Sequence, residues 1–411
     1  MSRQGGILSA VVLSAVLGAA AAQAQDKGPV KVGFLTVKSG ALAAGGRQME
    51  EGLKLCIDQH NGEMAGRKIE VVTADTAGQP AVTKTKTQEL VERDNVDVLI
   101  GPLAAFEALA IDDYIRKAEV PIISPSAAAE DLTQRKPNPW FVRAVGTSAQ
   151  AHHPLGEYAA KELGYKKIAI IADDFAFGHE IASGFQRVFQ DNGGTVVQKL
   201  WPPLNTADYG SYITQIDPDV DAVFAAFAGG NGIKFLGQYR NYGMTIPVLG
   251  SMTTVDEGIL KSMGDEAVGV ISAGWYSAGI DTPTNKTFVE AVRKAYGADP
   301  GYYTVGAYMA CEFLNNALEQ VEGDVSDKQA FMKALRNVDI DKSPYGPVKV
   351  DAYGQPIMDI EIRKVEEKDG RLQNSVIKTY PAVSQFWTYD PEKFLAGPVY
   401  SRDYAGGGES K

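Results

Sequence analysis

The sequence predicts an α/β protein with two lobes, each built around a doubly wound parallel sheet. Apolar runs that end in small residues lead directly into helical patterns, which is typical of central strands in a parallel sheet. The clearest run covers residues 96–100 and is followed by Gly101-Pro102 and a predicted helix over 103–111. The pattern restarts at Lys167, and 411 residues with 45% hydrophobic content suffice for two cores. We therefore expect two similar lobes with facing crevices.

The first half of the chain alternates strands and helices without interruption. Hydrophobic spacing predicts strand 31–37, a small-residue loop 39–46, helix 47–61, strand 68–75 and helix 81–93. A further strand from Val120 ends with hydroxyls on Ser124 and Ser126. Small residues at a helix start let a ligand approach free backbone N–H groups, so Ala104 and Ala105 are candidate site residues.

The second half repeats this order after a proline-rich stretch. The predicted segments are helix 148–163, strand 167–172, loop 173–178, helix 184–192, strands 195–200 and 221–227, helix 233–242, strands 246–250 and 269–275, helix 305–321, and strands 346–350 and 359–365. The end of the chain, 401–411, is predicted to be disordered.

The first 24 residues have the form of a cleaved signal peptide. Arg3 precedes an apolar run from Ile7 to Ala22, and Ala22-Gln23-Ala24 is a small-x-small peptidase site. A membrane anchor is the alternative, but the run is short and its far side carries no charged flank. Cleavage after Ala24 leaves 411 − 24 = 387 residues with a charge of 39 − 51 = −12, because Arg3 is the only charged residue removed.

The acidic balance and the two cysteines set further bounds. Nucleic-acid binding needs clustered Lys and Arg, and the sequence has no such run. No later stretch is long enough to span a bilayer, so the mature protein is expected to be soluble. Cys56 and Cys311 lie in apolar helical contexts. An exported protein could join them, but two distant cysteines do not define a disulfide scaffold, and we expect buried free thiols.

Four short segments follow one another behind the leader. They are Lys-Val-Gly-Phe-Leu-Thr-Val-Lys-Ser-Gly from Lys31, Val-Asp-Val-Leu-Ile-Gly-Pro from Val96, Ile-Ser-Pro-Ser-Ala-Ala-Ala-Glu-Asp-Leu-Thr from Ile123, and Phe-Val-Arg-Ala-Val from Phe141. In order and spacing they resemble the periplasmic leucine/isoleucine/valine-binding protein family, and the likeness covers nearly all of 31–364.

The resemblance implies a type I periplasmic binding fold. In that fold two lobes joined by three crossings close on a small-molecule solute and deliver it to an ABC permease in the inner membrane. Crossings are expected near 143–145, 272–275 and 346–348. The implied domains are signal peptide 1–24, lobe one 27–143 plus 274–346, and lobe two 146–272 plus 348–400. The protein is expected in the periplasm as a monomer without a cofactor, not spanning the membrane.

Three positions differ from the residues that, by the resemblance, would bind the carboxylate and ammonium groups of an amino acid. Ala105 stands where a hydroxyl would bind the substrate carboxylate, and Ala128 stands where a threonine is expected. The acidic partner of the substrate ammonium falls at Met252 or Thr253. A buried ammonium without a carboxylate partner is costly, so these departures weaken the assignment to amino acids.

The small and apolar residues at these positions suit an aromatic ring or an acyl chain. A carboxylate could rest on helix-start N–H groups, helped by Ser126. We predict an apolar or aromatic carboxylic acid, since the lining is similar to that of family members that bind plant-derived aromatic acids. The candidate ligand-binding residues are Ala104, Ala105, Phe106, Ser126, Ala127, Ala128, Phe177, Ala228, Met252, Thr253 and Trp275.

Several candidates have structural alternatives. Phe177 could pack the core of lobe two, and Trp275 could stiffen a crossing. Arg143 is interpreted as an interlobe structural residue rather than a carboxylate partner. Asp173 and Asp174 are interpreted as capping or solvated residues.

Signatures of catalysis and metal binding are absent from the sequence. The four histidines form no zinc motif, and adjacent His152 and His153 point to different faces of a helix. Residues 229–232 resemble a phosphate loop, but Phe235 stands at its third glycine. We predict a solute receptor with no catalytic and no metal site. A branched-chain amino acid binder, or a ligand-sensing periplasmic receptor for a separate membrane signalling partner, are the alternatives.

Overall fold

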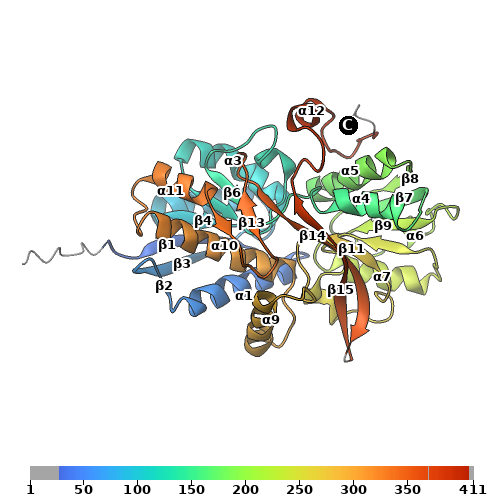
Figure 1. Ribbon diagram of the computed structural model, residues 1–411, viewed down its shortest axis with the longest axis horizontal. Coiled ribbons are helices and arrows are strands. Elements are labelled where there is room, and N and C mark those ends of the chain that lie inside the picture. Colours follow the sequence, from blue (N-terminus) through green and yellow to red (C-terminus); the bar gives the residue numbers. More distant parts are fainter. Residues whose placement is uncertain (1–26, 369, 407–411) are drawn as a thin grey trace, which may run out of the picture.

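Two α/β lobes lie side by side in the computed structural model (Figure 1). The structure describes residues 27–368 and 370–406. The predicted signal peptide, 1–24, lies outside the described residues. Within the described part of the chain, no helix is both long and apolar enough to cross a membrane.

The first lobe surrounds a six-stranded sheet with the order β2-β3-β1-β4-β5-β6. All neighbouring strands are parallel except the edge pair of β2 and β3. The central strands β4 and β5 are buried along their whole length, as their continuous apolar runs predict. The strands are β1 (Val30–Thr36), β2 (Glu63–Met64), β3 (Arg67–Asp75), β4 (Val98–Ile100), β5 (Ile122–Ser124) and β6 (Phe141–Arg143).

The second lobe surrounds a nine-stranded sheet. Its parallel part has the order β8-β7-β9-β10-β11, which matches β3-β1-β4-β5-β6 of the first sheet and confirms the predicted repeat. An antiparallel extension of β12 to β15 continues beyond β11, and the sequence analysis missed β15. The strands are β7 (Lys167–Ala172), β8 (Thr195–Leu200), β9 (Ala222–Ala226), β10 (Val248–Gly250), β11 (Ile271–Gly274), β12 (Asp339–Ile340), β13 (Val348–Val350), β14 (Pro356–Lys368) and β15 (Arg371–Val383).

Helices cover both sheets (Figure 1). They are α1 (Ala43–Gln59), α2 (Pro80–Gln88), the π-helical turn η1 (Glu89–Arg93), α3 (Ala105–Ala118), the 3-10 turn η2 (Glu130–Leu132), α4 (His152–Lys161), α5 (Ala176–Asp191), α6 (Gly210–Ile213), α7 (Asn231–Asn241), α8 (Glu257–Leu260), α9 (Pro283–Tyr296), α10 (Tyr302–Gln320), α11 (Lys328–Arg336) and α12 (Pro391–Ala396).

Helix α5 begins eight residues earlier than its predicted start at Gly184. Glycines in this stretch suggested a loop, but they serve close packing instead. A Cβ at Gly178 would collide with the carbonyl oxygen of Asp173, and one at Gly184 would lie 2.5 Å from the Cβ of Ala149. The prediction of a loop over 173–178 is therefore wrong from Ala176 onward.

The expectation of two free thiols is also wrong. Cys56 on α1 and Cys311 on α10 form a disulfide, with Cα atoms 6.2 Å apart. The two helices pack against each other along their length, and this packing brings together residues 255 positions apart in the sequence. Local spacing carries no signal for such a pair.

The C-terminal segment after α12 packs on the second lobe. Tyr404 is buried and its ring lies 5.2 Å from that of Tyr400, in a cluster with α12 and Val188 of α5. The prediction of a disordered tail over 401–411 therefore fails at Tyr404, because apolar ring contacts hold this segment. Residues 407–411 lie outside the described residues.

Candidate functional site

A cavity lies where the carboxyl ends of the parallel strands of both lobes meet. It encloses about 300 Å³ of empty space, part of it open to solvent. Segments that follow β1, β4, β5, β7 and β9, together with the first turn of α10, contribute its walls. The lining residues are Leu42, Leu103, Ala104, Ala105, Ser126, Ala128, Phe175, Phe177, Ala228, Tyr302 and Tyr303.

Two helix N-termini, one from each lobe, reach this cavity. Helix α3 begins at Ala105 and helix α5 at Ala176, and neither has a side-chain cap at its first exposed N–H groups. Among the described residues, the N–H groups of Ala105 and Phe106, and of Ala176 and Phe177, donate no hydrogen bond. Unpaired N–H groups and the helix dipole together favour an anion at this place.

The start of α3 is held in place by Glu107 in its first turn. The Glu107 carboxylate accepts from the backbone N–H of Ala104 at 2.9 Å and from the hydroxyl of Thr83 at 3.0 Å. Burial raises the pKa of Glu107, against the opposing effect of these hydrogen bonds. This anchoring leaves the next two N–H groups free to face a ligand.

Aromatic rings from both lobes close the cavity. Phe175 and Phe177 stack with ring centroids 5.8 Å apart, and Phe106 of the first lobe meets Phe175 edge to face at 5.6 Å. Such ring pairs contribute about 0.5–1.5 kcal/mol beyond their buried area. The Phe106–Phe175 contact therefore bridges the two lobes.

Three hydroxyls border the cavity, and two of them donate hydrogen bonds to backbone carbonyl oxygens. Ser126 donates to the carbonyl oxygen of Leu103 at 2.6 Å, and Tyr302 donates to the carbonyl oxygen of Ser126 at 2.6 Å. The Tyr303 hydroxyl makes no hydrogen bond to any described residue, and burial raises its pKa, so it stays protonated at neutral pH. Tyr303 is therefore the side chain with a free donor at this wall.

The lining residues carry no ionisable acid or base other than the two tyrosines. Buried carboxyls lie behind the wall: Glu107 and Asp256 accept from the backbone N–H groups of Ala104 and Tyr302, and Asp173 accepts from the N–H of Ala228 at 2.8 Å and from the amide of Asn231 at 2.9 Å. Burial raises the pKa of Asp173 to about 7. Asp173 thus braces the end of β7 against the start of α7, in line with the expected capping role.

The structure brings together part of the predicted site. Ala104, Ala105, Ser126, Ala128, Phe177 and Ala228 line the cavity, whereas Phe106, Ala127, Met252, Thr253 and Trp275 do not. The carbonyl oxygens of Ala127 and Met252 accept from Arg143 and Arg363, and the Thr253 hydroxyl donates to the Phe227 carbonyl oxygen. Trp275 is buried behind the wall, with its ring 5.0 Å from that of Tyr302.

Arg143 serves the junction between the lobes and not the cavity. Its guanidinium is buried and donates to the carbonyl oxygens of Ala127 and Ala129, to Thr133 and to the side-chain oxygen of Gln355. These partners link the end of β6 with the segment that precedes β14. The geometry agrees with the structural interpretation of Arg143.

Sequence reasoning missed Leu42, Leu103, Phe175, Tyr302 and Tyr303 among the lining residues. Phe175 lies in the segment already interpreted as a site loop, so it could have been added by its position beside Phe177. The two tyrosines open α10, which the sequence placed three residues too late. No local pattern indicates that α10 directs its first turn into the cavity.

The two adjacent histidines of α4 are buried and serve packing. His152 and His153 are fully buried; the ring of His152 bonds to the carbonyl oxygen of Ser148, and that of His153 to the hydroxyl of Tyr400. Burial lowers the pKa of His152 to about 3, so it is neutral at physiological pH.

Comparisons with known proteins agree with this two-lobed arrangement around a cavity. The family model described as "Periplasmic binding protein" matches residues 29–371. "Leu/Ile/Val-binding protein homolog 6" from Brucella melitensis is 29% identical over 370 residues, covering 88% of this chain and 94% of the relative.

Two solved structures from Rhodopseudomonas palustris are similar over most of the chain. A solute-binding protein from strain BisB5, in complex with 3,4-dihydroxybenzoic acid, is 34% identical with a TM-score of 0.83, covering 87% of this chain and 98% of the other. A second one, in complex with benzoate, is 28% identical with a TM-score of 0.82 and the same coverage.

The chain belongs to the periplasmic binding protein family. It is a substrate-binding protein of the ABC-transporter type, as the resemblance implied. The proteins it resembles are solute-binding proteins and not enzymes, in agreement with the sequence analysis.

Proposed function

We propose that this protein binds an aromatic carboxylic acid of the benzoate class and delivers it to an ABC importer. The observation that carries the proposal is the cavity itself: stacked phenylalanines and small residues line it, two uncapped helix starts reach it, and no carboxylate lines it. A ring fits the apolar walls, and an anion fits the helix starts.

The ligand is proposed to span the two lobes. Its ring lies against Phe177 and its carboxylate rests on the free N–H groups near Ala105, while the Tyr303 hydroxyl donates to an oxygen of the ligand. Contacts with both lobes exist only when the lobes are closed, so binding shifts the population toward the closed form. The permease then responds to that closed shape.

A branched-chain amino acid is the second candidate, because the relative from Brucella melitensis carries that name. Against it stands the lining: an α-ammonium group needs a carboxylate or several acceptors, and a buried unpaired ammonium is costly. Among the lining residues, only hydroxyl and carbonyl oxygens are present to accept from it.

The finer organisation is also part of the proposal. The leader is cleaved after Ala24, and the mature chain acts in the periplasm as a monomer beside its inner-membrane permease. Its lobes comprise 27–143 plus 274–346 and 146–272 plus 348–400. The chain changes sheet after β6, and after β11 its helix α10 packs against α1 and β5 of the first lobe, which supports the first two crossings.

The test is calorimetric titration and thermal shift of residues 25–411 with benzoate, 4-hydroxybenzoate and 3,4-dihydroxybenzoate, against leucine, isoleucine, valine and uncharged benzamide. We expect micromolar binding of at least one acid, a rise of the melting midpoint with that acid, and no shift with benzamide. Binding of the amino acids without the aromatic acids contradicts the proposal.

A pair of tyrosine variants locates the site. Tyr303→Phe removes the free hydroxyl and should weaken the acid roughly 3–10-fold, the usual contribution of one hydrogen bond. Tyr308→Phe on the same helix is the matched control, since its hydroxyl donates to Gln59 at 2.8 Å away from the cavity. Equal affinities of the two variants would place the ligand elsewhere.

A further inference from the structure

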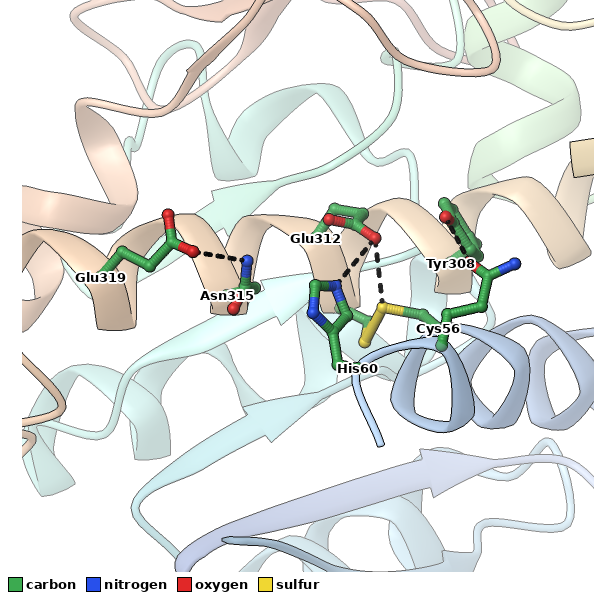
Figure 2. The surroundings of a disulfide bond; sticks show 8 residues. Cys56, His60, Tyr308, Glu312, Asn315 and Glu319 are labelled. Atoms are coloured by element: carbon green, nitrogen blue, oxygen red, sulfur yellow. Dashed lines mark hydrogen bonds and ion pairs between the residues drawn. A yellow bond between two sulfur atoms is a disulfide. The ribbon is translucent and has the colours of Figure 1, made fainter. Parts of the chain in front are cut away.

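Four potential metal-ligating side chains meet where α1 packs on α10, away from the cavity. Cys56 and His60 lie one turn apart at the end of α1, and Cys311 and Glu312 are neighbours on α10. Figure 2 shows His60 and Glu312 directed at each other beside the disulfide. Cys56, His60 and Glu312 place one ligand atom each within 4.8 Å of the others.

Two of the distances match those of a zinc site. The Nε2 of His60 lies 3.2 Å from Oε1 of Glu312, and Sγ of Cys56 lies 3.6 Å from the same oxygen. Tetrahedral zinc with bonds of about 2.0–2.3 Å requires separations of roughly 3.3 Å for N···O and 3.5 Å for S···O. The Glu312 oxygen therefore lies at zinc-site distances from His60 and Cys56, the His60–Cys56 separation is within 4.8 Å, and the two sulfurs must move apart once the disulfide is broken.

In the disulfide form the approach of the Glu312 carboxylate to the Cys56 sulfur at 3.6 Å is a packing contact, and His60 holds the same oxygen at 3.2 Å. A disulfide sulfur has no proton, so Cys56 donates nothing to Glu312, and the dashed line between them in Figure 2 marks proximity rather than a hydrogen bond. His60 and Glu312 keep 28% and 24% of their side chains exposed, whereas both cysteines are buried. Metal can thus enter from the solvent side.

We propose that, when the disulfide is reduced, Cys56, Cys311, His60 and Glu312 bind one zinc ion. Two thiolates, one imidazole and one carboxylate form a donor set suited to zinc, and each comes from a rigid helix or its end. The separation of 6.2 Å between the two cysteine Cα atoms leaves room for both sulfurs to reach the same ion.

The chemistry balances with a dithiol as reductant. The Cys56–Cys311 bond takes up two electrons and two protons from the dithiol, which becomes a disulfide, and two thiols result. Zinc then displaces the two thiol protons to solvent and binds the thiolates, together with the neutral His60 ring and the Glu312 carboxylate.

The zinc would keep the clamp between α1 and α10 that the disulfide provides. The residue before α1, Leu42, and the first turn of α10, Tyr302 and Tyr303, line the ligand cavity. The cross-link lies further along both helices, at Cys56 and Cys311, and holds the two helices against each other there. The same pair of helices would thus be cross-linked in oxidising and in reducing surroundings.

The experiment uses residues 25–411 in two forms, one air-oxidised and one kept with a phosphine reductant from cell lysis onward, with thiol counts confirming each state. Zinc is titrated against a chromophoric chelator. The reduced form should bind one zinc per chain with a dissociation constant below about 1 µM, and the oxidised form should not compete with the chelator. Cobalt(II) should give tetrahedral d–d bands and sulfur-to-metal charge-transfer bands.

Variants distinguish a four-residue zinc site from zinc binding by the two cysteine thiolates alone. His60→Gln and Glu312→Gln leave the disulfide intact and should each weaken zinc binding of the reduced form by at least about tenfold. Glu319→Gln, two turns further along α10, is the matched control, because within the described part of the chain Glu319 accepts a hydrogen bond from Asn315 alone (Figure 2). Equal zinc affinity in both redox forms, or unchanged affinity in both His60→Gln and Glu312→Gln, overturns the proposal.

Discussion

Opening the Cys56–Cys311 disulfide should lower the free energy of unfolding by up to about 5.6 kcal/mol. The bond joins residues 255 positions apart, and the parallel strands β7 to β11 of the second lobe lie between them. In the chain-entropy relation, a loop of this length loses about 19 cal/mol/K in the denatured state, which is about 5.6 kcal/mol at 25 °C. Structure that persists in the denatured chain reduces this value.

The assay is equilibrium unfolding in urea, followed by tryptophan fluorescence, at constant pH and with a strong chelator present so that no metal replaces the bond. Three samples are compared: the oxidised protein, the reduced protein, and Cys56→Ala/Cys311→Ala. The double variant also loses sulfur packing, since both side chains are fully buried. The reduced protein retains its sulfurs and isolates the effect of the cross-link.

A loss below about 1 kcal/mol on reduction would refute the reasoning, because it would mean that the cross-link does not restrict the denatured chain. Reductant added to the double variant is the control and should change nothing. A biphasic curve would show that the lobes unfold separately. In that case the second lobe is still folded when the first lobe unfolds, so the flexible part of the loop is shorter. Reduction should then lower the free energy of unfolding of the first lobe by less than the full value.

Three further predictions concern the lobes and the site. Gly229→Ala should weaken ligand binding by at least about tenfold in calorimetry, because the new Cβ would lie 2.5 Å from the carbonyl oxygen of Ala41 across the interlobe contact, at a φ of +56°. Phe177→Ala should weaken an aromatic acid by about 10–100-fold by removing the ring that stacks on Phe175. Burial raises the pKa of Glu130 to about 7, above the 4.5 of the unfolded chain; its stabilisation is complete below pH 4.5 and is lost as pH rises through 7. Urea unfolding should therefore show a free energy of unfolding that decreases between pH 4.5 and 8, and Glu130→Gln should make that decrease smaller.

Matched controls accompany these variants. Gly230→Ala adds a Cβ in open space at an ordinary φ of −78° and should bind normally. Glu63→Gln changes an exposed carboxyl and should leave the pH profile as it is. Phe177→Ala is also melted without ligand, so that lost packing is separated from lost binding. Normal affinity in Gly229→Ala, or a wild-type pH slope in Glu130→Gln, contradicts the respective argument.

The sequence alone determined the two repeated sheets and much of the cavity wall. Continuous apolar runs identify central strands, and in a doubly wound sheet the segments after neighbouring strands necessarily meet at one edge. Ala104, Ala105, Ala128 and Ala228 follow such strands, so their place at the cavity follows from order along the chain. For the same reason, the sequence could predict that these positions carry no acidic residue to bind a substrate ammonium.

Tertiary packing decided the rest. The disulfide and the first turn of α10 depend on how α1 and α10 lie against each other, which no local pattern encodes. Met252 and Trp275 follow strands as the alanines do, but neither lines the cavity: the Met252 carbonyl oxygen accepts from Arg363, and the Trp275 ring packs on Tyr302. Strand order sets which segments meet, whereas the competition among buried polar groups and rings for partners sets which side chains face the ligand.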